Sequence, residues 1–478
     1  MAYRKETLVT STIWKLLERF SSQAVSFVVT IILARILIPE EYGIIAILMV
    51  FINLANVIVD GGLNTALVQK KNADNIDFST IFLFCMGLAC ILYLILYFCA
   101  IPISRFYSND LLVPVLRILS LNLFFNSFNA IQRAYVSRNM LFKKLFYSNL
   151  ISVIISGIIG ILLAYNGFGV WALVAQQLIG QLVISILLCF AVKWKPTFVF
   201  SFDRFKGLFD YGWKIFLSNI IIAIYEDIRS VFIGKIYQPA TLAYYDRGKQ
   251  FPSLVMTNIN TSLQTILLPA FADIQDDRLR VKEVMRKSMK VTNFCVIPLL
   301  VGLIVAAKPL VLFILTEKWL PAVPFMQIFC VAFILMPIQS SNICAIKAMG
   351  YSGITLKIEL MKKVIEAIIL IVSFCINVYA VAVGVVIYNL ICVIINLYPN
   401  KKLLNYGLVE QISDVLPILL CSALMGMFVF WIQLLPIPIF CVLILQFLAG
   451  AILYIMLSRL FKIDSLGYVV SMIKAIIN

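Results

Sequence analysis

The chain has 478 residues, of which 62% are hydrophobic and only 13% are charged, and its mean hydropathy is +1.01. A soluble domain carries about a quarter charged residues and at most half apolar ones, so this composition excludes an ordinary soluble protein. The net charge of +16 does not indicate nucleic-acid binding, because the basic residues lie in short connections between apolar runs, as in membrane proteins.

Apolar runs follow one another along almost the whole chain, and a spanning helix needs about 20 mostly apolar residues. The first run begins in a polar-striped stretch without a small-residue cleavage site, so we interpret it as an uncleaved span and not as a signal peptide. The sequence predicts an all-α integral membrane protein of about 14 transmembrane helices, followed by a charged, partly amphipathic tail. The predicted helices are residues 12–37, 42–66, 79–103, 112–136, 146–165, 170–192, 207–233, 245–270, 289–315, 322–346, 356–378, 379–399, 413–434 and 436–458.

Two segments repeat one pattern at an offset of 200 residues. LARILIPEEYG begins at Leu33 and IGKIYQPATLA begins at Ile233, so a small residue, a cation, an isoleucine and a proline recur in register. A weaker echo, at an offset of 210, relates Pro114–Ile118 to Pro324–Ile328. Two lobes related by an axis along the membrane normal would produce this pattern, although interfacial turns also converge on proline and cations. We expect two pseudo-symmetric six-helix lobes, residues 1–200 and 201–400, then two additional helices and a cytoplasmic tail at 401–478.

Positive charge alternates between successive connections. The stretch 278–290 contains six basic residues, whereas the connection at 104–111 contains only Arg105. Because lysine and arginine are enriched in cytoplasmic loops, we expect the N- and C-termini to be cytoplasmic and the helix count to be even. The 11 cysteines form no Cys-x-x-Cys pair and histidine is absent, so neither a metal site nor a disulfide is predicted.

Polar residues recur within the apolar helices at spacings that place them on one helix face. A charge inside a span costs about 2.5–3.5 kcal/mol on insertion scales, so it marks a pathway or an internal pair by default. We interpret these stripes as the lining of a shared hydrophilic cavity, with hydrogen bonding between helices as the alternative. The residues expected to bind substrate are Lys15, Arg19, Asn53, Asn56, Asn126, Asn129, Arg133, Lys214 and Arg229.

Carboxylates in the spans are candidates for ion coupling. Asp60 is expected at the same depth as Arg19 on the adjacent helix, so it either pairs with Arg19 or carries a coupling proton or sodium ion. For Lys15 and Arg19, the alternative to substrate binding is that their long side chains only extend to place their charges among the lipid headgroups. Asp227 is the second coupling candidate, beside Glu226. A similar charged set is interpreted as a structural pair and consists of Lys362, Lys363 and Glu366.

Several segments, taken together, resemble the Wzx-type polysaccharide flippases (of the O-antigen, exopolysaccharide and teichuronic-acid kind) of the multidrug/oligosaccharidyl-lipid/polysaccharide exporter superfamily. The resemblance covers about residues 8–400 and is densest in the first 180, while the last two helices match only in hydropathy. The segments are ARILIPEEYG from Ala34, DGGLNTALVQK from Asp60, QRAYVSRNMLFKK from Gln132, GFGVWALVAQQ from Gly167, YYDRG from Tyr244 and PAFADIQ from Pro269.

The resemblance implies a two-lobed, fourteen-helix transporter with a central cavity that alternates between the two membrane sides. Its substrate would be an undecaprenyl-pyrophosphate-linked oligosaccharide, moved to the outer leaflet of the bacterial plasma (inner) membrane for lipopolysaccharide or exopolysaccharide synthesis. The expected partners are this polyprenyl-pyrophosphate-linked glycan, membrane lipids and, as a further option, the glycan polymerase and chain-length machinery. No cofactor, no metal and no nucleic acid are expected.

The residues agree with this implication, because arginine and lysine bind a pyrophosphate well and the polar stripes offer partners for sugars. The sequence contains no Walker A motif, so an ion gradient is the expected drive, as in an antiporter. The alternatives are an exporter of drugs or small molecules and a peptidoglycan-precursor flippase of the same superfamily. A membrane glycan polymerase or ligase is a weaker alternative because the predicted outer loops are short, and a structural scaffold has no use for a charged interior.

Overall fold

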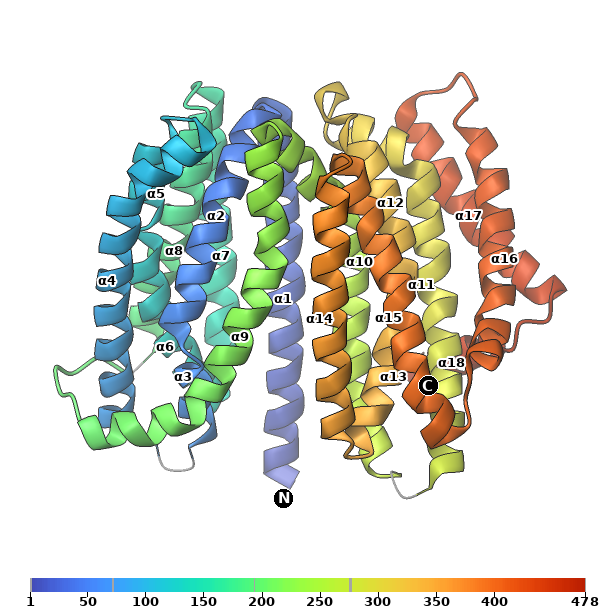
Figure 1. Ribbon diagram of the computed structural model, residues 1–478, viewed down its shortest axis with the longest axis horizontal. Coiled ribbons are helices and arrows are strands. Elements are labelled where there is room, and N and C mark those ends of the chain that lie inside the picture. The colour runs from blue at the N-terminus through green and yellow to red at the C-terminus, as the bar shows by residue number, and fades with distance from the viewer. Residues whose placement is uncertain (1, 71–72, 193, 275–276, 478) are drawn as a thin grey trace. The chain divides into compact units, whose positions relative to one another are not determined.

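The computed structural model describes residues 2–70, 73–192, 194–274 and 277–477, and every regular element in these ranges is a helix. The all-α prediction is therefore confirmed, and each predicted helix coincides with one helix or with a helix in two pieces (Figure 1). The bounds are α1 Ala2–Ile36, α2 Pro39–Asp60, α3 Leu63–Gln69, α4 Asn75–Tyr107, α5 Leu112–Leu119, α6 Asn122–Arg138, α7 Phe142–Tyr165, α8 Val170–Ala191, α9 Phe202–Ile236, α10 Pro239–Ala272, α11 Arg278–Ile314, η1 Glu317–Trp319, α12 Ala322–Ile334, α13 Met336–Ala348, α14 Ser352–Phe374, α15 Val378–Leu404, α16 Leu408–Ile432, α17 Ile439–Leu460 and α18 Asp464–Ile477.

Eleven segments of the described chain are long and apolar enough to cross a membrane. They do not include α9, α10 and α14, so the number 14 stays a prediction. The chain is a multi-pass membrane protein.

The predicted internal repeat recurs at the level of helix ends. α1 ends at Ile36 and α2 begins at Pro39, and at the same offset of 200 residues α9 ends at Ile236 and α10 begins at Pro239. Proline suits the first position of a helix, because the amide it lacks would have no partner there. The second offset also recurs, since the interrupted helices α5/α6 and α12/α13 begin 210 residues apart, at Leu112 and Ala322.

The helices gather into two compact units, residues 1–243 (unit 1) and 244–478 (unit 2). In unit 1, α9 packs against α2, α3 and α4, so this helix belongs with those that precede it. The predicted six-helix lobes with boundaries at residues 200 and 400 stay a prediction.

In unit 1, small residues allow α7 to lie close to α1 and α8. A side-chain carbon added to Gly157 would meet Val29 of α1, and one added to Gly160 would lie 3.0 Å from Gln176 of α8. Ser152 of α7 donates a hydrogen bond to the Gly180 carbonyl of α8. Close approach through small residues is how helices associate where lipid removes the hydrophobic driving force.

The break between α2 and α3 positions the site described below. α2 ends at Asp60, and Gly61 and Gly62 follow in the left-handed region, with φ of 51° and 68°. A β-carbon on Gly62 would lie 2.6 Å from the Gly212 carbonyl oxygen of α9. Glycine is required here both for the backbone conformation and for this close contact.

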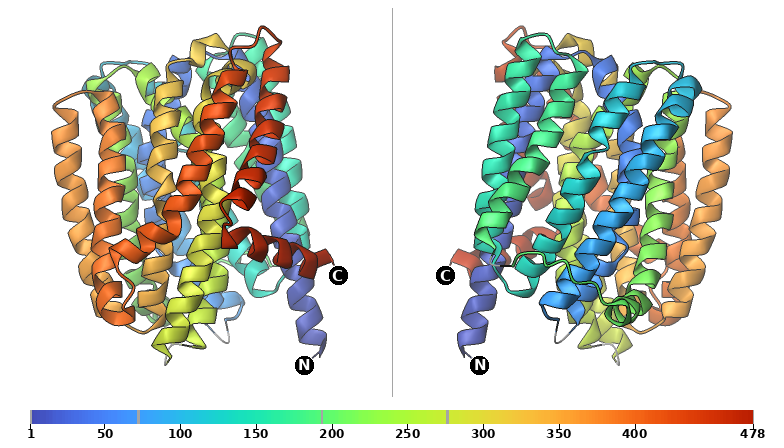
Figure 2. Two further views of the ribbon diagram at one scale, coloured as in Figure 1. Left: turned by 90° about the vertical axis from the view of Figure 1, so that its right-hand side faces the viewer. Right: turned by 90° about the vertical axis from the view of Figure 1, so that its left-hand side faces the viewer.

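In unit 2, the last helices are fixed to α11 by charge and by buried hydrogen bonds. Asp414 of α16 receives two hydrogen bonds of 2.6 Å from Arg286 and one of 2.8 Å from the Tyr406 hydroxyl, and Lys290 lies 3.1 Å away. Tyr454 of α17 donates to the Phe294 carbonyl at 2.9 Å. Figure 2 shows the short α18 lying across the direction of α17.

Candidate functional site

Arg133 of α6 is the cation at the centre of the candidate site in unit 1. Its charge interacts with the carboxylates of Asp60, at the end of α2, and Glu18 of α1. Asp60 also accepts a 2.9 Å hydrogen bond from Asn64 of α3. α3 begins directly after the break that follows Asp60, so four helix segments contribute to one cluster.

Glu18 is a member of this cluster that the sequence interpretation missed. Its carboxylate lies 3.5 Å from the Lys15 amine and accepts a hydrogen bond from Asn149 of α7. Its side chain is only 13% exposed, whereas that of Lys15 is 53% exposed. The signal was available, because a carboxylate three residues after a lysine lies on the same helix face.

One of the two expected arrangements for Asp60 was a pair with Arg19, and among the described side chains that pair is not formed. The cation whose charge interacts with Asp60 is Arg133. Helical spacing and depth indicated that Arg19 and Asp60 were suitably placed. They do not fix the rotation of each helix about its axis, which decides the faces that meet. The predicted binding role of Arg19, which is half-buried, stays a prediction.

The predicted asparagines divide into two groups. Asn126 donates to the Asn56 carbonyl oxygen at 3.0 Å and both are half-buried, while Asn53 is exposed on the same helix. Asn129 is 1% exposed and donates to the Gln181 side chain at 3.0 Å, and Ser185 donates to it at 2.9 Å. Asn129 therefore makes the hydrogen bonds between helices that were the alternative explanation for the stripes.

The predicted residues of α9 do not all lie near Arg133. Lys214 is exposed and follows Gly212, whose backbone packs on Gly62 beside Asp60. The remaining set begins 12 residues further on, about 18 Å along a helix. Glu226 is exposed there, and Asp227 and Arg229 are half-buried and each have an interaction partner.

The charges around Arg133 lie on an exposed face of unit 1. Lys15, Asp60 and Arg133 are all exposed although their helices are apolar enough to span a membrane. A charge that faced hydrocarbon would cost several kcal/mol, so this face borders water or a polar ligand. Within the described ranges, no three cysteine, aspartate or glutamate side chains are grouped so that they could hold a metal ion.

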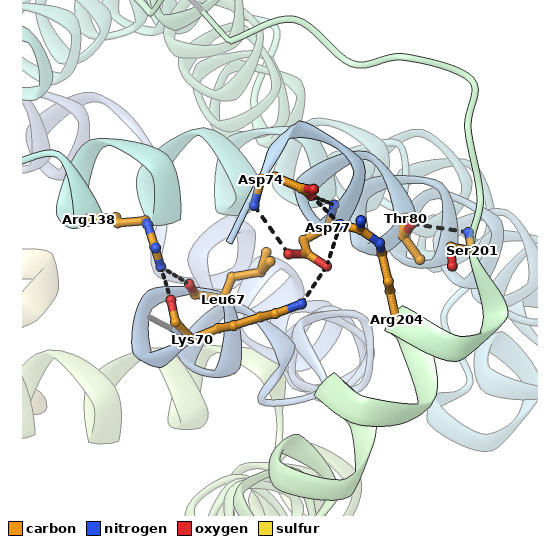
Figure 3. Close-up of polar contacts among 8 residues, drawn as sticks. All are labelled: Leu67, Lys70, Asp74, Asp77, Thr80, Arg138, Ser201 and Arg204. Atoms are coloured by element: carbon orange, nitrogen blue, oxygen red, sulfur yellow. Dashed lines mark hydrogen bonds and ion pairs between the residues drawn. The ribbon is translucent and has the colours of Figure 1, made fainter. Parts of the chain in front are cut away.

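A second charged cluster joins the ends of four helices (Figure 3). The fully buried Asp77 lies 2.7 Å from the Lys70 amine and 3.4 Å from the Arg204 guanidinium, which also contacts Asp74. Arg138 donates to the Leu67 carbonyl at 3.0 Å and to the Lys70 carbonyl, so it caps the end of α3. Arg204 holds the pKa of the Asp74 carboxyl below its usual range. The cluster fixes α3, α4, α6 and α9 to one another.

The charged set in α14 of unit 2 forms ion pairs, which agrees with its interpretation as a structural pair. Lys363 lies 2.9 Å from Glu366, and Lys362 lies 3.2 Å from Glu359. Both pairs lie within one helix, with their partners three residues apart.

Comparisons with known proteins identify the family and the fold. Residues 32–324, more than half of the chain, match the family described as Polysaccharide biosynthesis protein. The succinoglycan biosynthesis transport protein ExoT of Rhizobium meliloti (strain 1021) is 26% identical over 349 residues, 73% of this chain and 71% of that protein. The lipopolysaccharide biosynthesis protein WzxC of Escherichia coli (strain K12) is 22% identical over 369 residues, 76% of this chain and 74% of that protein.

Among solved structures, the lipid II flippase MurJ in an inward closed conformation superposes with a TM-score of 0.75 at 20% identity, covering 95% of this chain and 99% of that one. An inward-facing MATE family multidrug resistance transporter of the MOP superfamily gives 0.58 at 15% identity, covering 84% and 98%. These likenesses show a shared transporter fold. The family match, which covers more than half of the chain, identifies the chain as a member of the family described as Polysaccharide biosynthesis protein.

Proposed function

We propose that this protein flips undecaprenyl-pyrophosphate-linked oligosaccharide units from the cytoplasmic to the outer leaflet of the bacterial inner membrane, by ion-coupled alternating access. The observation that carries the proposal is Arg133, an exposed arginine on a spanning helix of unit 1 whose charge interacts with two carboxylates. A guanidinium there suits a pyrophosphate, which it can bind through two parallel hydrogen bonds. The relatives are named for succinoglycan and lipopolysaccharide synthesis, which supports a glycan-bearing substrate.

In this proposal, the pyrophosphate binds Arg133 together with Lys15 and Arg19 of α1. Exposed or half-buried amides nearby, from Asn53, Asn56 and Asn126, hydrogen-bond the first sugars. Lys214 adds positive charge beside the α2/α3 break, and Arg229 adds it further along α9. Asn129 supports the site indirectly, because its hydrogen bonds hold α6 against α8.

Asp60 is the first candidate for the coupling ion, and Asp227 and Glu226 are the second. A carboxylate that neutralises Arg133 competes with an arriving pyrophosphate, and protonation would remove that competition. We also propose that both termini are cytoplasmic, and that the flipped glycan passes to a polymerase and its chain-length machinery.

Deletion of the gene tests the proposed substrate. We expect the lipid-linked oligosaccharide to accumulate on the cytoplasmic side and wild-type protein to restore its export. Arg133→Ala should reduce export by about tenfold or more, because hydrogen bonds to charged groups are worth about 1.5–3 kcal/mol. Arg117→Ala is the matched control, since Arg117 lies at the other end of the same interrupted helix and stacks 4.0 Å from the Tyr97 ring.

Normal export by a stably expressed Arg133→Ala protein would contradict the role of Arg133. Accumulation of the peptidoglycan precursor, or loss of drug resistance with normal glycan export, would instead favour the alternative transporters of the same fold.

A further inference from the structure

The start of α9 and the segment before it expose a group of aromatic side chains. Phe198 is 92% exposed and Phe202 is 68% exposed, although such side chains are normally buried. They lie outside the segments that are apolar enough to span, the last of which in unit 1 ends at Ala191. The other exposed members are Phe200, Phe209 and Trp213.

This segment lies across the other helices of unit 1. Figure 1 shows the first turns of α9 running crosswise at the end of α4, before the helix turns to run alongside α2. In the right-hand view of Figure 2 the same turns are seen nearly end-on. The Arg204 pairs with Asp74 and Asp77 hold these turns against the start of α4 (Figure 3).

The crosswise turns have one face packed against the protein. Residues three or four apart share a helix face. Leu208 is buried, and Arg204, one turn before it, makes the ion pairs with α4. This face fixes the orientation of the two others.

The second face is aromatic and the third is polar. Phe202, Phe205 and Phe209 follow one another along the aromatic face, with neighbouring ring centroids 6.3 and 5.5 Å apart. Phe205 also packs 4.5 Å from the Phe84 ring of α4. The polar face is exposed and consists of Asp203, Lys206 and Asp210.

One face of this helix packs against the protein, a second is aromatic and a third is charged. Such a helix fits the boundary between lipid headgroups and hydrocarbon. Helices that lie in this boundary bury Phe, Trp and Leu side chains and keep charged residues in water. Apolar side chains are also exposed at the end of α8 and further along α9, such as Phe190 at 85% exposure and Leu217 at 49%.

We propose that residues 198–213 form an interfacial segment that lies in one phospholipid leaflet, at the end of unit 1 that carries Asp74. Its aromatic face enters the acyl boundary, its polar face meets water, and Arg204 fixes it to α4. The occupant of the aromatic surface is therefore lipid and not a second protein. This inference does not depend on the identity of the transported substrate.

Spin labelling of the full-length protein in phospholipid nanodiscs tests this placement. Single cysteines are introduced by Phe198→Cys, Phe202→Cys and Phe209→Cys in a background in which the 11 native cysteines are replaced. Asp203→Cys and Asp210→Cys on the same turns are the matched controls. The accessibility of each label to oxygen, which enters lipid, is compared with its accessibility to a water-soluble nickel chelate.

We expect oxygen to be favoured several-fold at the aromatic positions and the nickel chelate to be favoured at the aspartate positions. A strong preference for the nickel chelate at all five positions would overturn the proposal, because the segment would then lie in water. Shielding of positions 202 and 209 from both reagents would also overturn it, because protein and not lipid would then cover this face. Unchanged thermal unfolding of each labelled variant shows that the labelled protein is folded.

Discussion

At the scale of single residues, the charges around Arg133 nearly cancel. Lys15 and Arg133 are positive, and Glu18 and Asp60 are negative, so the cluster offers little net attraction to an anion unless one carboxylate changes its state. These opposite charges attract one another, and an arriving pyrophosphate must compete with that attraction. Proton uptake by a carboxylate would therefore favour substrate binding.

Asp60→Asn tests this coupling. The neutral amide fits the same space and cannot release or take up a proton, so we expect export that is slower and no longer responds when the proton or sodium gradient is collapsed. Glycan export is measured in cells treated with ionophores, and Asp110→Asn, at an exposed position in another connection, is the control.

A purely structural role for Asp60 has a different signature. The Asp60→Asn protein would then express poorly and would be rescued in part by neutralising Arg133, its charge partner, more than by neutralising Arg19. Export that stays fully gradient-dependent in a well-expressed Asp60→Asn protein rules out Asp60 as the coupling group.

The sequence allowed the charged residues of this cluster to be identified, but not the contacts between them. Asp60 and Arg133 were both recognised, because charges are rare in apolar helices and their spacing indicates a shared face. The interaction between them was not predicted, because it depends on how α2 and α6 are rotated against each other. Glu18 was missed although it lies between Lys15 and Arg19 in the sequence, because only the cations and neutral polar residues of this helix were considered.

At the scale of helices, breaks and ends place the site. The sequence predicted the turns at Pro39 and Pro239, because proline fixes the start of a helix. It predicted one helix at 112–136 where the structure has α5 and α6, since Ser120 and Leu121 between them carry no proline or glycine signal. The break after Asp60 had a signal in Gly61 and Gly62, but its geometry depends on the contact with α9.

The cluster that joins four helix ends should contribute to stability mainly through Asp77. This carboxylate is fully buried and lies near two cations, so we expect Asp77→Asn to lower the free energy of unfolding by about 1–3 kcal/mol. The expected decrease is smaller than for a fully buried ion pair, because Lys70 and Arg204 are partly exposed. Asp74→Asn should cost less, because Asp74 is 49% exposed and such pairs contribute little.

Thermal unfolding in detergent, followed by tryptophan fluorescence, measures the difference between the two variants.

The contribution of Asp74 to stability should also depend on pH. Its pKa is lower in the folded protein than in the unfolded chain, so its stabilisation is complete above the unfolded value and is lost as the pH falls through the folded one. Equal melting temperatures of Asp77→Asn and wild type would show that the cluster does not hold these helix ends.

At the scale of the whole molecule, the alternation of basic connections is a prediction of orientation. Basic residues stand at or just after the ends of three helices: Lys70 at α3, Arg138 at α6 and Lys195 at α8. The connections after α1 and α7 contain no basic residue. Because basic loops stay in the cytoplasm, we expect the end with Asp74 to be cytoplasmic.

Reporter fusions check this orientation. A fusion after residue 478 and one in the segment 271–288 should both report the cytoplasm, while one in the segment 104–111 should report the outside. Reversed signals would contradict the orientation, and opposite signals from the first two would contradict the even number of spans.

The close contacts of α7 affect how defective alleles of this gene should be interpreted. Gly157, Gly160 and Gly180 lie where α7 meets α1 and α8, and any larger residue at the first two displaces a neighbouring side chain. In a screen for loss of surface polysaccharide, substitutions on this line of glycines would score as strongly as substitutions at Arg133. A transport-negative allele there reports a helix contact, and only alleles that leave the protein abundant in the membrane identify groups that meet the cargo.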